Sequence, residues 1–182
     1  MTALSSLNGT FTIDASHSSI SFVTRHAMIT KVRGSFTDFT GTAQGNGANP
    51  ADASVQVSIN AASVNTRNEG RDGHLVSADF FDVEQFPTIA FTSTAVTVVD
   101  ADTLELTGDL TIKDVTKSVT IPFDFTGAAT DPFGNERVGF EGSVVVNRKD
   151  FGLTWNAALE TGGVLVSEKA TLEFEISAIK AA

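Results

Sequence analysis

The sequence predicts an all-β protein, an antiparallel sheet of about eight strands that closes into a barrel, with one short helix. The main observation is alternation at period two: in 104–112, for example, Leu104, Leu106 and Leu110 alternate with polar residues. A second observation is the length of several such runs, about ten residues, since a sheet of long strands must curl and closure removes its exposed edges. We expect a single domain over residues 1–182.

Composition and charge exclude several function classes. The chain has no cysteine, which excludes disulfides and thiolate metal sites. The net charge of −10 argues against nucleic acid or an anionic membrane surface as a partner, because attraction to phosphate comes from clustered Lys and Arg. The start, MTALSSLNGT, contains neither a basic residue nor an apolar run. We therefore expect no signal peptide, no stable membrane insertion and a cytoplasmic location.

The first half of the chain is expected to form strands. Alternating runs lie at 10–15, 18–26, 32–45 and 54–60. Within the third run the apolar positions change phase between Phe36 and Phe39, which predicts a β-bulge near Thr37 and Asp38.

The stretch 71–91 holds the only helical pattern. Asp72 is the expected N-cap, and the apolar residues that follow predict a helix over about 72–81. Pro87 prevents the helix from continuing, and a strand pattern starts at Thr88. A helix this short is stable only when its apolar face packs against other elements. We therefore expect it at the mouth or the inner wall of the barrel.

The second half continues the strand pattern. Further strand candidates lie at 88–95, 104–112, 115–126, 138–146 and 164–176. Pro122 lies on the polar face of its strand, which predicts an edge or bulge position because proline cannot donate to a ladder. The connection 147–163 is long enough to suggest a function. We expect Arg148 and Asp150 to close it onto the barrel, and Trp155 either to cap the interior or to bury the loop.

The interior is expected to be apolar throughout. Fourteen phenylalanines stand against one tryptophan and no tyrosine, and phenylalanine supplies apolar area without a polar group that needs a partner. A barrel of this size is either filled by its own side chains or holds one small ligand, and composition leaves both open. Glycines on the apolar faces, such as Gly34 and Gly108, either relieve curvature or leave room for a ligand.

Four blocks of sequence resemble the YceI-like family of bacterial lipocalin-like proteins. In chain order they are FVTRHAMITKVRGSFTDFTG, SVNTRNEGRDGHLVSADFFDVEQFPTIAF, TGDLTIKDVTKSVTIPFDF and GFEGSVVVNRKDFGL. The resemblance implies an eight-stranded antiparallel lipocalin-like barrel, a homodimer, and a long internal tunnel that takes a polyisoprenoid or similar amphiphilic lipid. Asn65 and Arg67 depart from the family, which often has an aspartate or a glycine in this segment.

The leading hypothesis is a non-catalytic protein that carries or sequesters a long-chain isoprenoid-type lipid, such as a polyprenol, a polyprenyl phosphate or a prenylquinone, without a cofactor. The predicted lipid contacts are Phe22, His26, Phe36, Arg71, Leu75, Val76, Phe80, Phe81, Ile89, Phe91, Phe125, Phe140, Phe151 and Trp155. His26 is either a hydrogen-bonded rim residue or a donor to the lipid head group. Arg71 either pairs with Asp72 at the helix start or forms an anion site there.

Two other function classes stay open. A barrel enzyme would act on a bound isoprenoid with His26 as acid or base, although the chain has no nucleophile elbow, phosphate-binding loop or paired-carboxylate motif. A structural or stress-response interaction module would have a filled core. His17, His26 and His74 show none of the paired spacings of metal sites, so we expect no metal.

Overall fold

The computed structural model describes residues 3–182, which form one antiparallel sheet of eleven strands. The strands are β1 (Asn8–Ile13), β2 (Ser19–His26), β3 (Thr30–Phe36), β4 (Phe39–Asn46), β5 (Ser54–Asn60), β6 (Val64–Asn65), β7 (Thr88–Val98), β8 (Thr103–Ile112), β9 (Val115–Thr130), β10 (Glu136–Asn147) and β11 (Lys169–Lys180). The helices are α1 (Glu69–Val76) and the short 3₁₀ helices η1 (Leu4–Ser6), η2 (Ala15–His17), η3 (Pro50–Asp52), η4 (Ala61–Ser63) and η5 (Arg148–Phe151). No helix in this described part of the chain has the length and apolarity that a bilayer crossing requires.

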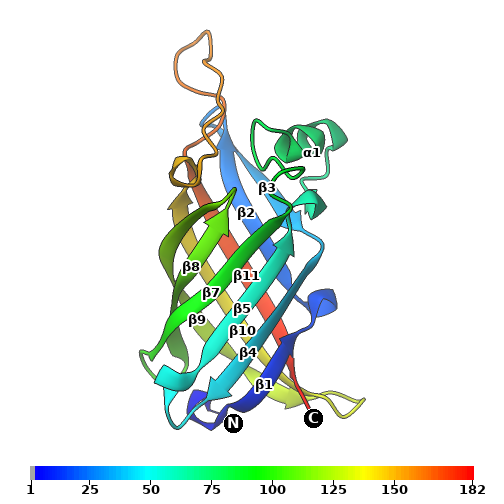
Figure 1. Cartoon of the computed structure of the whole chain (residues 1–182), viewed down its shortest axis with the longest axis vertical. Helices are drawn as coiled ribbons and strands as arrows, with labels where there is room; N and C mark the ends of the chain where they lie inside the picture. Colours follow the sequence, from blue (N-terminus) through cyan, green and yellow to red (C-terminus); the bar gives the residue numbers. More distant parts are fainter. Residues whose placement is uncertain (1–2) are drawn as a thin grey trace.

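The sheet closes into an eight-stranded barrel because three of its eight positions are interrupted strands. β1 and β2 share one position, since both pair with β11, through Ile13 opposite Ala178 and Val23 opposite Thr171. β3 and β4 share the next position, and β5 and β6 the third. β7 to β11 complete the ring in chain order (Figure 1). The predicted eight-stranded antiparallel barrel is confirmed.

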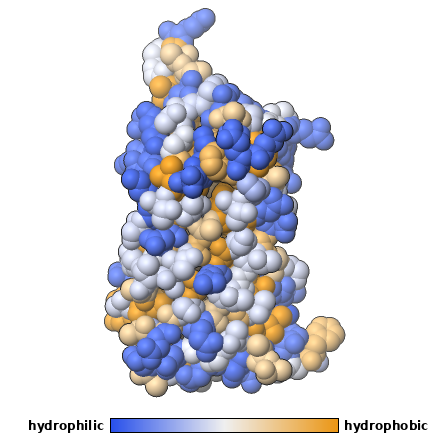
Figure 2. All heavy atoms as spheres, in the orientation of Figure 1, coloured by the Kyte–Doolittle hydropathy of each residue, from blue (hydrophilic) through white to orange (hydrophobic). Residues whose placement is uncertain are grey.

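The two ends of the barrel are built differently. α1 and the segment 148–168 lie at the upper end in Figure 1, and both chain termini lie at the lower end. The outer face over β5, β7 and β8 is mostly pale or blue in Figure 2, as expected for strands whose outward residues are serine, threonine and charged side chains. Inward residues therefore carry the apolar half of the alternation.

The two predicted irregularities of the sheet have different outcomes. The change of apolar phase near Thr37 and Asp38 is a break between two strands and not the predicted β-bulge, since β3 ends at Phe36 and β4 begins at Phe39. Pro122 lies just beyond Phe123, where the pairing of β9 with β10 ends, so it occupies an edge position on that side. Neither feature interrupts the closed ring.

The start of α1 differs from the predicted 72–81. The helix begins after Asn68, whose Oδ1 accepts a hydrogen bond from the backbone N–H of Arg71 at 2.9 Å. Asn68 rather than Asp72 is therefore the N-cap. The carboxylate of Asp72 instead accepts from the backbone N–H and the hydroxyl of Thr66, at 2.8 and 2.5 Å. It anchors the helix to the strand segment before it.

The end of α1 is also earlier than predicted. The helix ends at Val76, and the carbonyl of Ser77 accepts from the backbone N–H groups of Phe80 and Asp82, which closes a turn. Asp82 adopts a left-handed conformation, with φ at 49°, that helices do not continue through. Phe80 and Phe81 are buried from this turn, at 6% and 9% exposure. Their burial, rather than helical periodicity, explains the apolar pattern that suggested a longer helix.

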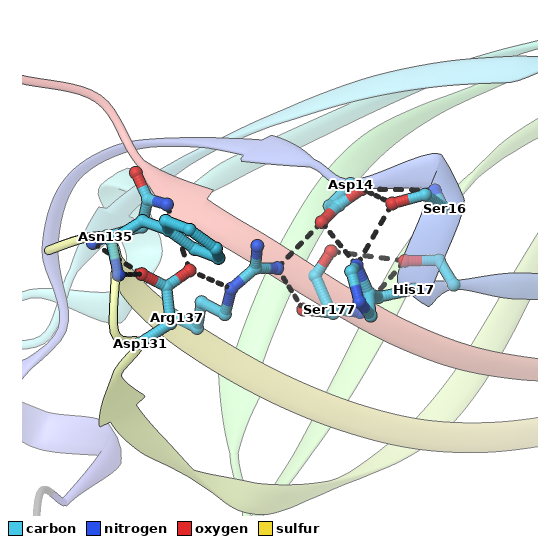
Figure 3. Close-up of polar contacts among 9 residues, drawn as sticks. Asp14, Ser16, His17, Asp131, Asn135, Arg137 and Ser177 are labelled. Carbon is cyan, nitrogen blue, oxygen red and sulfur yellow. Dashed lines mark hydrogen bonds and ion pairs between the residues drawn. The ribbon is translucent and has the colours of Figure 1, made fainter.

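A polar cluster on the outer surface holds the barrel closed where β11 meets β1 and β2 (Figure 3). We call Asp14, His17, Asp131, Arg137 and Ser177 the seam cluster. Arg137 donates from Nη1 to Oδ2 of Asp14 and from Nε to Oδ2 of Asp131, both at 2.7 Å. Nδ1 of His17 lies 2.8 Å from Oδ2 of Asp14. One guanidinium thus joins the segment between β1 and β2 to the turn between β9 and β10.

These contacts lower the pKa of both carboxyls. The hydrogen bond from Ser16, followed by that from Arg137, holds the pKa of Asp14 well below its ordinary value. Asn135 and then Arg137 do the same to the pKa of Asp131. Because the pKa of each carboxyl is lower in the folded than in the unfolded chain, the native state binds fewer protons. This stabilisation is present above about pH 4 and is lost as the pH falls below it.

We predict that Arg137→Met lowers the urea midpoint of unfolding at pH 7. The midpoint should also fall less steeply between pH 7 and pH 3 than in the native protein, because the pKa values of Asp14 and Asp131 are then closer to their ordinary values. Arg33→Met is the matched control, since Arg33 pairs with Glu173 at the exposed surface, where an ion pair contributes about 0–1 kcal/mol. An unchanged pH dependence in Arg137→Met would contradict the role of the seam cluster.

Candidate functional site

An elongated apolar cavity of about 560 Å³ lies inside the barrel. At one end it is lined by Leu4 and Leu7 beside η1, and at the other by His74, Leu75 and Trp155 beside α1. Twelve-residue strands such as β10 and β11 span about 40 Å, and the usual tilt of about 40° makes such a barrel about 30 Å tall. The volume falls within the range of about 300–1,000 Å³ of sites that enclose a small molecule. The interior is therefore hollow.

Inward glycines hold large side chains against the barrel wall. A Cβ added to Gly34 would lie 2.3 Å from Cζ of Phe22, its partner across β2 and β3. A Cβ on Gly142 would lie 2.6 Å from Cδ1 of Phe123, its partner across β9 and β10. A Cβ on Gly108 would likewise lie 2.4 Å from Phe91, and one on Gly41 2.4 Å from Ile13, each on a neighbouring strand. These glycines make room for a neighbouring side chain of the wall, which leaves the barrel axis free.

Three rings in edge-to-face and tilted contact close the α1 end of the cavity. The ring centroid of Trp155 lies 4.6 Å from that of His74 and 5.5 Å from that of Phe80. The rings of His74 and Phe80 meet edge to face at 5.0 Å. Nε2 of His74 is hydrogen-bonded to Oδ2 of Asp79 at 2.8 Å, which orients the imidazole. Trp155 therefore caps the interior, and it joins the 148–168 segment to α1.

Arg148 holds the 148–168 segment on the barrel from inside. Arg148 is only 6% exposed. Nε donates to the carbonyl of Ser167 at 2.8 Å, Nη1 to the carbonyls of Leu153 and Trp155 at 2.6 and 2.9 Å, and Nη2 to that of Val166 at 3.4 Å. Burial lowers the pKa of Arg148. The prediction that Arg148 closes the long connection is confirmed.

Two other predicted polar contacts are wrong. Asp150 is exposed, and its side chain forms no hydrogen bond or ion pair with any residue of 3–182. Arg71 does not pair with Asp72 either. Its Nε donates to the hydroxyl of Thr66 at 2.7 Å and its Nη2 to the carbonyl of Thr66 at 2.9 Å. The carboxylate of Asp72 accepts hydrogen bonds from the backbone N–H and the hydroxyl of Thr66. Arg71 and Asp72 therefore both bind Thr66 but do not bind each other.

A family model described as the YceI-like domain matches residues 11–178. The chain belongs to the YceI-like family. A UPF0312 protein of Staphylococcus aureus strain N315 is 37% identical to it over 172 residues, which cover 92% of this chain and 98% of that relative. The resemblance seen in the four sequence blocks is therefore confirmed over most of the chain.

Solved structures share the same barrel. The YceI protein of Campylobacter jejuni is 30% identical, with a TM-score of 0.75 over 87% of this chain and 90% of that chain. BcnA of Burkholderia cenocepacia reaches a TM-score of 0.80 at 23% identity, over 91% and 98%. A structure described as a polyisoprenoid binding domain from Saccharophagus degradans reaches 0.73 at 16% identity, over 94% and 98%. The last two likenesses support the YceI-like fold alone.

All but two of the predicted lipid contacts line the cavity of this YceI-like barrel. Those that do are Phe22, His26, Phe36, Arg71, Leu75, Phe80, Phe81, Ile89, Phe91, Phe140, Phe151 and Trp155. Val76, at the end of α1, packs on the core without lining the cavity. Phe125 shares the inward face of β9 but is buried in a separate cluster with Leu4 and Phe11, at the end where η1 closes the barrel. The role of the lining residues as ligand contacts stays a prediction.

Several lining residues were missed because periodicity does not mark them. Arg25 and Thr66 line the α1 end and lie near the ends of strands, where alternation stops. Leu4 and Leu7 line the opposite end from a start of the chain that shows no alternation. Among residues 3–182, no three His, Asp or Glu side chains gather in a group that could hold a metal ion.

We predict that Gly34→Ala moves the ring of Phe22 off the wall and into the cavity, because the new Cβ takes the place of the ring. The substitution should cost about 1–3 kcal/mol of stability through overpacking and reduce the longest lipid tail that the barrel admits. Gly73→Ala is the control, since nothing lies within 4 Å of its added Cβ and helix propensity favours alanine. Thermal unfolding and a tail-length series measured on both variants check this. Equal behaviour of the two would contradict the wall packing.

Proposed function

We propose that this YceI-like protein binds a long-chain isoprenoid-type lipid inside its barrel and carries or sequesters it without catalysis. The observation that supports this most directly is the apolar cavity that extends from η1 to α1. A prenyl tail needs a long apolar space, whereas its head group needs polar side chains at one end only. Arg71, His74 and Arg148 line the α1 end, whereas the polar residues that line the η1 end, such as Gln44 and Asn46, are uncharged.

Burial of the tail supplies the affinity in this proposal. Each buried CH₂ contributes about 0.8 kcal/mol, so a tail of about twenty carbons contributes about 16 kcal/mol. Association and ordering cost about 4–15 kcal/mol. The difference, about 1–12 kcal/mol, favours binding without a strong polar contact. The similar fold of a polyisoprenoid binding domain from Saccharophagus degradans supports this class of ligand.

The alternatives receive less support from the geometry. A filled-core interaction module would need side chains in the space that the cavity occupies. An enzyme with His26 as acid or base would need a partner that orients the imidazole. His26 is exposed at the rim, and its ring forms no hydrogen bond with the part of the chain between residues 3 and 182.

We predict that uptake strengthens with tail length. Native mass spectrometry of the purified protein should show a complex with geranylgeraniol and little or none with geraniol, because about ten fewer carbons remove about 8 kcal/mol of tail burial. Protein that carries no amphiphile when purified and takes up neither alcohol nor an added prenylquinone would contradict the proposed function.

Two phenylalanines provide matched variants for the same measurement. Phe22→Ala removes a ring that lines the cavity, and it should alter the preferred tail while the fold persists. Phe125→Ala removes an identical ring from the cluster beside η1, and it should cost about 3–5 kcal/mol of stability, as in a filled core. If Phe22→Ala destabilised the protein as much as Phe125→Ala and left tail preference unchanged, the lining assignment would be wrong.

A further inference from the structure

The charged side chains that line the cavity are all positive. Among residues 3–182 they are Arg25, Arg71 and Arg148, and no aspartate or glutamate lines the cavity. The chain nevertheless has 22 acidic residues against 12 Lys and Arg. Arg71 belongs to α1, Arg25 lies near the end of β2, and Arg148 begins η5. The lining therefore has the opposite sign to the net charge of the molecule, and the positive charge gathers at one end.

Arg148 is a buried cation with no direct ion pair, although the charge of Glu168 acts on it from a distance. Its N–H groups donate to backbone carbonyls only, and it takes part in none of the ion pairs between the described residues. The carboxylate of the nearby Glu168 is engaged by Nζ of Lys149 at 2.5 Å. Carbonyl oxygens satisfy hydrogen bonds but do not cancel a full charge. A buried charge in this state attracts an anion strongly.

Arg71 offers a second guanidinium in a fixed orientation. Its Nε and Nη2 are both held by Thr66, at 2.7 and 2.9 Å, and Thr66 is itself held by Asp72. Nη1 of Arg71 donates to no atom of residues 3–182. One edge of the guanidinium is therefore anchored, and the other edge is free to bind a ligand that enters the cavity.

Both guanidinium groups border the same part of the cavity. Nη1 of Arg148 donates to the carbonyl of Trp155, and the ring of Trp155 meets that of His74 edge to face at 4.6 Å. His74 lies one turn after Arg71 on α1. The guanidinium of Arg25 is exposed, and its Nη1 donates to the carbonyl of Ile29. Arg71 and Arg148 are thus the two cations beside the end of the cavity that Trp155 caps.

We propose that the lipid head group bound here is anionic, a phosphate or a carboxylate, and that it lies between Arg71 and Arg148. This inference rests on the proposed lipid-binding function and selects among its head groups. A prenol hydroxyl or a quinone carbonyl could accept a hydrogen bond from the same donors but would bring no negative charge to the two guanidinium groups. An anion accepts charge-assisted hydrogen bonds, about twice as strong as neutral ones, and the planar fork of arginine matches phosphate and carboxylate geometry.

The test compares two lipids with the same tail, geranylgeranyl phosphate and geranylgeraniol. Titration is followed by the fluorescence of Trp155, the only tryptophan of the chain. The phosphate should bind about tenfold to a hundredfold more tightly than the alcohol, as hydrogen bonds to charged groups require. Arg71→Gln should reduce this ratio, because the phosphate loses a charge-assisted hydrogen bond whereas the alcohol loses a neutral one, which is about half as strong. Arg33→Gln makes the same change of charge outside the cavity lining and should keep the ratio of the native protein.

The outcomes distinguish failure of the anionic head group from failure of lipid binding itself. Equal affinity for both lipids, or an equal ratio in Arg71→Gln and Arg33→Gln, would overturn the anionic head group and leave the lipid-binding function intact. Binding of neither lipid would overturn both. A third titration uses inorganic phosphate alone. It should not change the fluorescence of Trp155 at the concentration at which geranylgeranyl phosphate saturates the protein. Binding of inorganic phosphate as tight as that of the lipid would assign the site to a free anion and overturn the inference.

Discussion

The cavity depends on closure of the barrel, and the barrel closes where one side of β11 pairs with two separate strands, β1 and β2. β1 holds the last part of β11 and β2 holds the first part, so the interruption at η2 must be bridged for the ring to stay closed. The backbone N–H of Asp14 donates to the carbonyl of Ser177, and the backbone N–H of Ser177 donates to the hydroxyl of Ser18, both at 2.9 Å. Arg137 adds its two carboxylate partners across the same place. Without this bridge β11 would present an open edge, and the inward face would meet water.

Closure alone does not explain why the barrel is hollow. Barrels of this size can be filled by their own side chains, and this chain has fourteen phenylalanines with which to do it. The register decides the outcome. Phe22 lies opposite Gly34 and Phe123 lies opposite Gly142, so each ring covers a glycine instead of meeting a second large side chain. Apolar area is buried along the wall, and the axis stays free.

The wall could be predicted from the sequence because period two reports directly which face of a strand is buried. The end of the helix could not, since Phe80 and Phe81 are buried from a turn and imitate the apolar face of a helix. The bulge between Ser93 and Ala95, which brings Val96 into the lining, has no local signal. The partners of Arg148 and Arg137 depend on distant segments, Asp14 and Arg137 being 123 positions apart. Such contacts form only when the barrel closes, and no pattern among neighbouring residues of the sequence indicates them.

Under the proposed function, the tail and the head of a lipid would meet parts of the molecule that are largely independent. Tails of equal length would gain the same burial along the wall, so selectivity between two lipids with the same tail would come from the head group. Those differences arise at α1 and the 148–168 segment, which add to the barrel without being part of its ladder. The side chain of Arg71 is anchored only to Thr66, so under the proposal its substitution would change head-group preference with little effect on the wall. Arg148 differs, because its guanidinium both supplies charge and holds the segment that carries Trp155, and these two roles cannot be separated by one substitution.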